Sequence, residues 1–327
     1  MLQPLGTAGI RRMNRYVRWA AVGVILMLGL LTLLQRKIMY PATTATKLPA
    51  AAYPLLTQLF HSAVDIELTT PDRLKIRGWH LRRNPKPSQF TWLLFHGNGG
   101  DRARRGRWYQ MASQLNCDVI AIDYHGYGDS EGRPSQDNLC EDARAAWSYA
   151  RNELGLPSER IIVVGESLGG AVAVQLAAEA SRKGEIPKAL VLACTFDSML
   201  NAANHHFPII PVNWILADRW ESDRQITDVA CHILQFHGDS DVVVPLPLGQ
   251  RLHNLAPPIS HDGRAKQFFL FPGTNHNDLL SRDGEEIQRQ IGMLVNGEWA
   301  RRIYLRMVTS EPVPSSSKTS RMSLSPR

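Results

Sequence analysis

The stretch that decides the fold of this chain is Gly165-Glu166-Ser167-Leu168-Gly169. It follows the apolar run 161–164 and precedes a segment of small residues that starts at Gly170. This pattern predicts a strand, a sharp turn with Ser167 at its apex, and a helix, and is typical of a nucleophile elbow. The glycines let strand and helix approach closely, and the helix N-terminus favours negative charge beside the hydroxyl. By itself the pentapeptide also fits a helix N-cap in which Ser167 only caps.

An acid and a base follow later in the chain, each on a loop after an apolar run. Residues 231–237 are typical of a buried strand and lead into a loop that contains Asp239 and Asp241. Residues 268–271 predict the next strand, and His276 lies on the loop after it. A serine nucleophile needs a histidine base and a carboxylate that orients it. We expect Ser167, Asp241 and His276 to form that triad, with Asp239 as the alternative acid.

A glycine-rich loop predicts the site that would hold a substrate oxyanion. The apolar run 92–95 predicts a strand, and it is followed by His96-Gly97-Asn98-Gly99-Gly100. We expect the backbone N–H groups of Asn98 and Leu168 to form an oxyanion hole, in which one donor contributes about 10²–10³ in rate. The alternative is an ordinary strand-to-helix turn.

Together these motifs resemble one family. They comprise residues 96–99, 123–132, 165–170, 237–245 and 273–278. Over roughly residues 35–296 the chain resembles membrane-anchored α/β-hydrolase-domain serine hydrolases, which are related to prolyl-oligopeptidase-like and dienelactone-hydrolase-like enzymes. The resemblance implies an α/β-hydrolase fold and a triad in the chain order serine, aspartate, histidine. Two departures are His125, where the family usually has a supporting arginine, and Gly99, where alanine is frequent.

Composition places the chain among globular proteins with basic ends. Its 327 residues, 44% of them hydrophobic, suffice for one large α/β core. Residues 1–64 carry seven Lys or Arg and no Asp or Glu, and residues 301–327 carry six Lys or Arg and one acidic residue. The net charge of the whole chain is +7. The middle is therefore mildly acidic, which argues against nucleic-acid binding. The four cysteines show no metal-binding spacing. We expect them to be free and buried, with a Cys117–Cys140 disulfide as the alternative.

An uncharged, mostly apolar run extends from Trp19 to Leu34, after Arg11, Arg12, Arg15 and Arg18. It predicts a transmembrane signal-anchor over 16–35 after a basic segment 1–15. The positive-inside rule then places the hydrolase domain outside the cytoplasm, and the lack of an N-glycosylation sequon favours the periplasmic side of a bacterial inner membrane. The alternatives are a signal peptide cleaved near residues 43–45 and an organelle presequence or cytosol-facing anchor.

The rest of the chain predicts one domain. Strands that alternate with helices over 61–300 indicate a mostly parallel central sheet with helices on both faces, after a linker over 36–60. Residues 196–226 form the longest excursion, an apolar, proline-punctuated segment expected to be a small cap over Ser167. His96, Phe207 and Trp214 are expected to contact substrate, although a packed connection without that role is the alternative. Residues 308–327, rich in Ser and Pro, are expected to be disordered.

The sequence therefore predicts a serine hydrolase that cleaves carboxylic esters or thioesters with apolar acyl groups. Its expected partners are a small-molecule substrate, with lipid as one option, and a membrane. No cofactor is expected. A metal is not expected either, because the adjacent His205 and His206 point in different directions and could not bind one ion together. A peptidase of prolyl-oligopeptidase type is the alternative enzyme, although a propeller-sized gating domain is absent from the sequence. A non-catalytic binding protein is the second alternative, and it would predict a broken triad.

Overall fold

The central element of the computed structural model is an eight-stranded sheet, and the structure describes residues 7–45 and 47–298. The strand order is β1-β2-β4-β3-β5-β6-β7-β8. Strands β3 to β8 run parallel, whereas β1 and β2 are antiparallel to their neighbours. The strands are β1 (Ser62–Thr69), β2 (Lys75–Arg82), β3 (Thr91–Phe95), β4 (Asp118–Ile122), β5 (Ile161–Glu166), β6 (Ala189–Ala193), β7 (His232–Gly238) and β8 (Gln267–Phe271).

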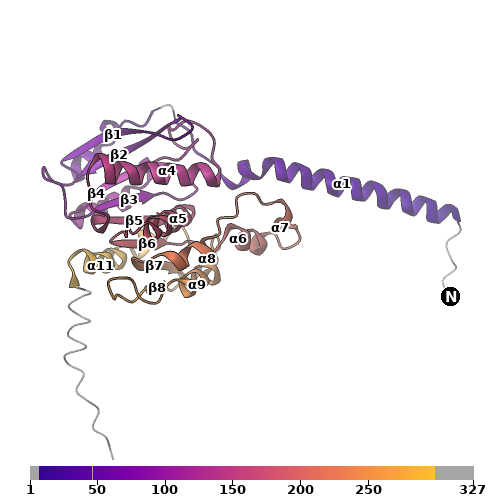
Figure 1. Cartoon of the computed structure of the whole chain (residues 1–327). Coiled ribbons are helices and arrows are strands. Elements are labelled where there is room, and N and C mark those ends of the chain that lie inside the picture. Colours follow the sequence, from indigo (N-terminus) through magenta and orange to yellow (C-terminus); the bar gives the residue numbers. More distant parts are fainter. Residues whose placement is uncertain (1–6, 46, 299–327) are drawn as a thin grey trace, which may run out of the picture.

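Helices cover both faces of this sheet (Figure 1). Alternate strand residues point to opposite sides, so Leu93 belongs to one apolar cluster and Leu94 to the other. The first cluster lies under α4, α5 and α9, and the second under α2, α3 and α11. The helices are α1 (Thr7–Met39), α2 (Pro54–Leu59), α3 (Gly106–Gln114), α4 (Gln136–Ser148), α5 (Leu168–Arg182), α6 (Met199–His206), α7 (Val212–Ile215), α8 (Ser222–Gln225), α9 (Leu246–Leu255), α10 (Leu279–Arg282) and α11 (Gly284–Val295). The predicted mostly parallel α/β sheet is confirmed.

Two of the helices have distinctive N-terminal ends. Residues Arg102–Arg104 form a short 3₁₀ turn, and α3 begins after it at Gly106. Helix α4 begins at Gln136, because the Ser135 hydroxyl caps it by accepting a hydrogen bond from the N–H of Asn138 at 3.2 Å. The four cysteines are free and buried, as expected.

The histidine that departs from the family pattern is buried and paired. His125 Nδ1 lies 2.6 Å from a carboxylate oxygen of Asp142, and Nε2 lies 3.2 Å from Asp72. Burial alone would lower the pKa of His125, but the two carboxylates outweigh it and raise that pKa above its ordinary value. His125 therefore favours a cationic form at a position where the resemblance implies an arginine.

The segment predicted as a linker is part of the folded domain. Tyr40, Leu48, Leu56 and Phe60 are buried, and α2 starts with Pro54 at a position that suits proline. The carbonyl of Leu48 accepts a hydrogen bond from the Trp79 indole at 2.9 Å. The segment predicted as a linker over 36–60 therefore packs against the sheet, and its apolar residues recur too irregularly for the sequence to predict this packing.

The N-terminal helix α1 is a long extension beside α6 and α7 (Figure 1). Within the described residues one helix is long and apolar enough to cross a membrane, Met13–Met39, with a mean hydropathy of 2.1 over its most apolar 18-residue window. The helix continues beyond the predicted 16–35. The tail expected to be disordered, 308–327, lies outside the described residues.

Candidate active site

The predicted elbow is a tight turn between β5 and α5. Ser167 has φ 54° and ψ −117°, a left-handed backbone conformation that residues with a side chain rarely adopt. A methyl group on Gly165 or Gly169 would collide with neighbouring backbone, including the carbonyls of Phe95 and His96 in the case of Gly169. The Ser167 N–H donates to the Ala193 carbonyl at 2.8 Å, and the Thr195 hydroxyl donates to the Ser167 carbonyl at 2.8 Å. These contacts hold the strained turn from both sides.

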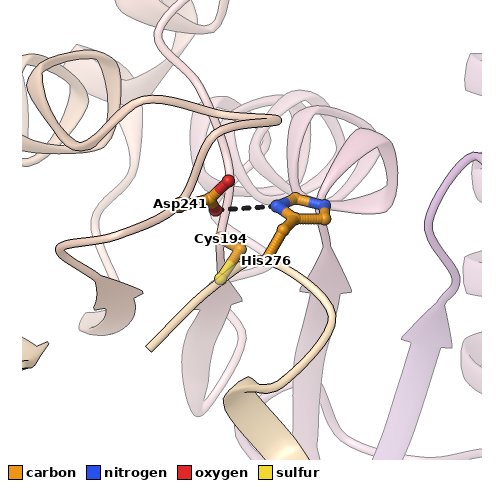
Figure 2. Close-up of side chains that lie close together, drawn as sticks. All are labelled: Cys194, Asp241 and His276. Carbon is orange, nitrogen blue, oxygen red and sulfur yellow. Dashed lines mark hydrogen bonds and ion pairs between the residues drawn. The ribbon is translucent and has the colours of Figure 1, made fainter. Parts of the chain in front are cut away.

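The expected acid and base lie in direct contact at the carboxyl end of the sheet (Figure 2). Asp241 follows β7 and His276 follows β8, and His276 Nδ1 lies 2.7 Å from Asp241 Oδ2. The other carboxylate oxygen of Asp241 accepts hydrogen bonds from the N–H groups of Val243 and Val244 at 2.9 and 2.7 Å. Asp241 is thereby fixed, and it fixes the imidazole in turn.

Burial by itself would raise the pKa of Asp241. The hydrogen bond and charge of His276 outweigh burial, so the pKa of Asp241 lies below its ordinary value. Asp241 is therefore a carboxylate at neutral pH, the form that orients a histidine base. Asp239 is placed differently, because it is exposed and accepts a hydrogen bond from the Gly273 N–H at 2.7 Å.

Cys194 is the third side chain of this cluster (Figure 2). Ligand atoms of Cys194, Asp241 and His276 lie within 4.8 Å of one another, an arrangement that also suits a metal ion or a thiol nucleophile. However, Cys194 is only 1% exposed, and burial followed by the charge of Asp241 raises the pKa of its thiol. A buried, protonated thiol is a poor nucleophile and a poor metal ligand. The cluster thus fits an aspartate–histidine pair beside an inert thiol.

Ser167 lies at the same edge of the sheet, since it follows β5, and β5, β6, β7 and β8 are parallel neighbours. Among the described residues, no hydrogen bond joins the Ser167 hydroxyl to His276. Such bonds are often longer in the free enzyme and shorten when substrate is bound.

The loop predicted to hold the oxyanion packs against Ser167. A Cβ placed on Gly97 would lie 3.3 Å from the Ser167 Cβ, so the loop passes directly beside the nucleophile candidate. The next residue, Asn98, is fixed through its side chain: Oδ1 accepts a hydrogen bond from the Tyr127 hydroxyl at 2.6 Å, and Nδ2 donates to the Met39 carbonyl at 2.5 Å. Leu168 is the first residue of α5, where backbone N–H groups have no partner within the helix.

An apolar pocket of about 460 Å³ opens at Ser167. Its floor contains Ser167, Asn98 and Leu168. The cap, residues 196–226, contributes one wall, which includes Met199, Phe207 and Ile215. The opposite wall is formed by the end of α1, through Leu31, Gln35, Ile38 and Met39. The pocket therefore joins the elbow, the cap and the apolar N-terminal helix.

Phe207 lines this pocket, whereas the other two expected substrate contacts do not. Trp214 is 87% exposed, because α7 turns its neighbours Val212 and Ile215 inward and leaves the indole outside. His96 is 1% exposed, and its ring packs against Tyr124 and Tyr127. Its Nδ1 lies 2.7 Å from the Gly97 carbonyl, so His96 supports the loop from within the core. Trp214 and His96 therefore do not line this pocket.

A second, more polar hollow of about 250 Å³ borders His276. Arg104, Arg105 and Arg107 line it together with Glu166. Arg105 donates to Glu166 at 2.7 Å, while Arg104 and Arg107 are exposed. No periodic pattern in the sequence predicts this hollow, because its residues come from four separate segments.

Fold and geometry define an α/β hydrolase, and comparison with known proteins agrees. Residues 93–230 match the alpha/beta hydrolase fold family. An uncharacterised protein of Mycobacterium tuberculosis is 31% identical over 267 residues, which cover 81% of this chain and 89% of that protein. The chain belongs to the alpha/beta hydrolase family.

Two further relationships concern proteins with named activities. A lysophosphatidylserine lipase of Danio rerio is 32% identical over 195 residues, which cover 55% of this chain and 50% of that protein. A solved esterase of Pyrococcus furiosus superposes with a TM-score of 0.60 at 19% identity, covering 79% of this chain and 95% of that structure. The similarity to the esterase structure shows the fold alone. With the family match, these relationships support a hydrolase.

Proposed function

We propose that this protein is a serine hydrolase that cleaves carboxylic esters or thioesters with an apolar acyl group. The observation that carries the proposal is the apolar pocket that ends at Ser167, beside a paired Asp241 and His276. An acyl chain in that pocket would place its carbonyl carbon at the elbow. The polar hollow that borders His276 suits a polar leaving group.

The proposed reaction has two steps, acylation of Ser167 and hydrolysis of the acyl-enzyme. His276 Nε2 takes the proton of Ser167 as Oγ attacks the carbonyl carbon, and the N–H groups of Asn98 and Leu168 stabilise the oxyanion. The bond to the leaving oxygen or sulfur then breaks, and His276 gives its proton to that atom. Water next attacks the acyl-enzyme with His276 again as base, which releases a carboxylic acid and restores the Ser167 hydroxyl. Asp241 holds the imidazole through Nδ1 in both steps.

Activity is expected to depend on the length of the substrate's acyl chain. With p-nitrophenyl esters from acetate to palmitate, we expect kcat/KM to rise with acyl length until the pocket is filled, because each buried methylene contributes about 0.8 kcal/mol. Thioester reporters should follow the same order, and a prolyl peptide reporter should be hydrolysed far more slowly. Preference for the peptide would favour the peptidase alternative. Binding of long-chain esters without turnover by folded protein would favour the non-catalytic alternative.

We also propose that α1 anchors the protein as a single membrane span, with the hydrolase domain on the extracytoplasmic side of a bacterial inner membrane. A chain cleaved near residue 45 would lose contacts that the domain uses. Gln35 accepts a hydrogen bond from the Ala217 N–H at 2.7 Å, and Arg36 pairs with the buried Asp218 at 2.9 Å. Tyr40, next to α1, also donates to Asp218, at 3.0 Å. These contacts support a retained helix.

For this topology we expect the full-length protein to remain in membranes washed with alkaline carbonate, with its N-terminal residues present in the mature mass. Protease added to spheroplasts should degrade the hydrolase domain. The positive flank before the helix motivates this orientation. Release by carbonate together with a mass that starts near residue 46 would instead establish a cleaved signal peptide. Protection of the domain in intact spheroplasts would contradict the proposed side.

A further inference from the structure

The part of α1 nearest the hydrolase domain has one distinct face. Residues 13–39 are exposed except Leu28, Leu31, Gln35 and Met39, which are half-buried. Their spacing of three, four and four residues places them on one stripe of the helix. A helix that served only as an anchor would need no such stripe on the protein side. The stripe faces the cap, since α1 contacts α7 and three of the four residues line the apolar pocket.

This face is fixed to the site by polar contacts at its end. The Gln35 amide donates to the Ile215 carbonyl at 3.0 Å and accepts from the Ala217 N–H, so it bridges α1 to the cap. The last carbonyl of α1, that of Met39, accepts the hydrogen bond from Asn98 in the oxyanion loop. These hydrogen bonds fix α1 against the cap, which would hold the acyl chain, and against the oxyanion loop, which would hold the carbonyl oxygen.

The pocket wall also coincides with the expected membrane boundary. Residues 19–35 of α1 are uncharged between Arg18 and Arg36, and at ~1.5 Å per residue they span about 25 Å, close to the ~30 Å of a hydrocarbon core. Leu31 then lies among lipid acyl chains, and Ile38 lies at headgroup level. Trp214 and Ile209, which are 87% and 95% exposed on the cap, are the residue types that enter a membrane interface.

We propose that α1 is a wall of the acyl-binding site. The acyl chain of a single-chain membrane lipid lies between α1 and the cap, and its ester reaches Ser167 directly from the bilayer. One apolar pocket accommodates one chain, which is why we infer a monoacyl lipid. This inference rests on the proposed function, since it assumes that Ser167 attacks an ester.

The test compares two tryptophan variants of the full-length protein in phosphatidylcholine vesicles. Leu31→Trp fills the pocket wall. Leu33→Trp is the matched control, because Leu33 is 82% exposed and points away from the cap. Excluding about two methylenes from the pocket corresponds to about tenfold in affinity. We therefore expect Leu31→Trp to lower kcat/KM on a monoacyl lipid by at least about tenfold and to lower it less on p-nitrophenyl acetate, whose acyl group is far shorter, while Leu33→Trp matches wild type on both.

A crosslinking measurement avoids dependence on the fold of the variants. A lysophosphatidylcholine with a diazirine in its acyl chain is irradiated with the Ser167→Ala protein, which cannot consume it. We expect crosslinks in the peptide that contains residues 31–39 and in the cap. Crosslinks confined to other segments, or equal hydrolysis of the lipid by Leu31→Trp and Leu33→Trp, would overturn the inference while leaving the esterase proposal intact. Failure of the wild type to hydrolyse any p-nitrophenyl ester from acetate to palmitate would remove the proposed function and this inference with it.

Discussion

Replacement of Ser167 with alanine is expected to lower kcat/KM for the best ester substrate by about 10⁶, the scale of losing a triad nucleophile. The physical reason is that Ser167 lies at the strained turn and lines the apolar pocket, so its hydroxyl is the one an acyl chain in the pocket would meet. The loss should appear in kcat, while the fold remains intact by circular dichroism and thermal melting.

Cys194→Ala is the matched control for this substitution, because Cys194 is the other nucleophilic side chain beside His276. Since its thiol is buried and protonated, we expect the variant to retain activity within a few-fold of wild type. Near-normal turnover by Ser167→Ala together with an inactive, folded Cys194→Ala protein would assign the nucleophile to the thiol.

Replacement of Asp241 with asparagine is expected to lower kcat by about 10⁴, because an amide no longer stabilises the charged imidazole and favours the wrong tautomer. The 2.7 Å contact to His276 Nδ1 is the basis of this expectation. Asp239→Asn is the matched control, since that exposed carboxylate contacts the Gly273 N–H, and an asparagine oxygen preserves the same hydrogen bond. Initial rates with a p-nitrophenyl ester measure both variants.

The two aspartate variants discriminate sharply between the candidate acids. A crippled Asp239→Asn enzyme with a nearly normal Asp241→Asn enzyme would show that the carboxylates were assigned in the wrong order. Equal, small losses in both would argue that the Asp241–His276 contact has no part in turnover.

The sheet and the position of the candidate triad could be predicted because their signals are local. Apolar runs such as 161–164 are long enough to identify strands, and parallel strands bring the loops after them to one edge. The order of Ser167, Asp241 and His276 along the chain was therefore enough to predict that Asp241 and His276 meet, as they do at 2.7 Å.

The contacts of α1 and of the following segment could not be predicted in the same way. Their partners, Asp218 and Asn98, lie far away in sequence, and an apolar helix gives the same pattern whether or not one face packs on protein. The direction of a side chain on a short element is also not encoded locally. Trp214 on the four-residue α7 and His96 inside the core show this, since both were expected at the pocket and face elsewhere.

Mapping the site of one covalent adduct would identify the nucleophile. Full-length protein in vesicles is treated with a long-chain alkyl fluorophosphonate, digested, and analysed by mass spectrometry. We expect a single modified residue, Ser167, with labelling abolished in Ser167→Ala and slowed in Asp241→Asn. An adduct at any other residue, or unmodified Ser167 in a folded protein that still hydrolyses esters, would contradict this assignment.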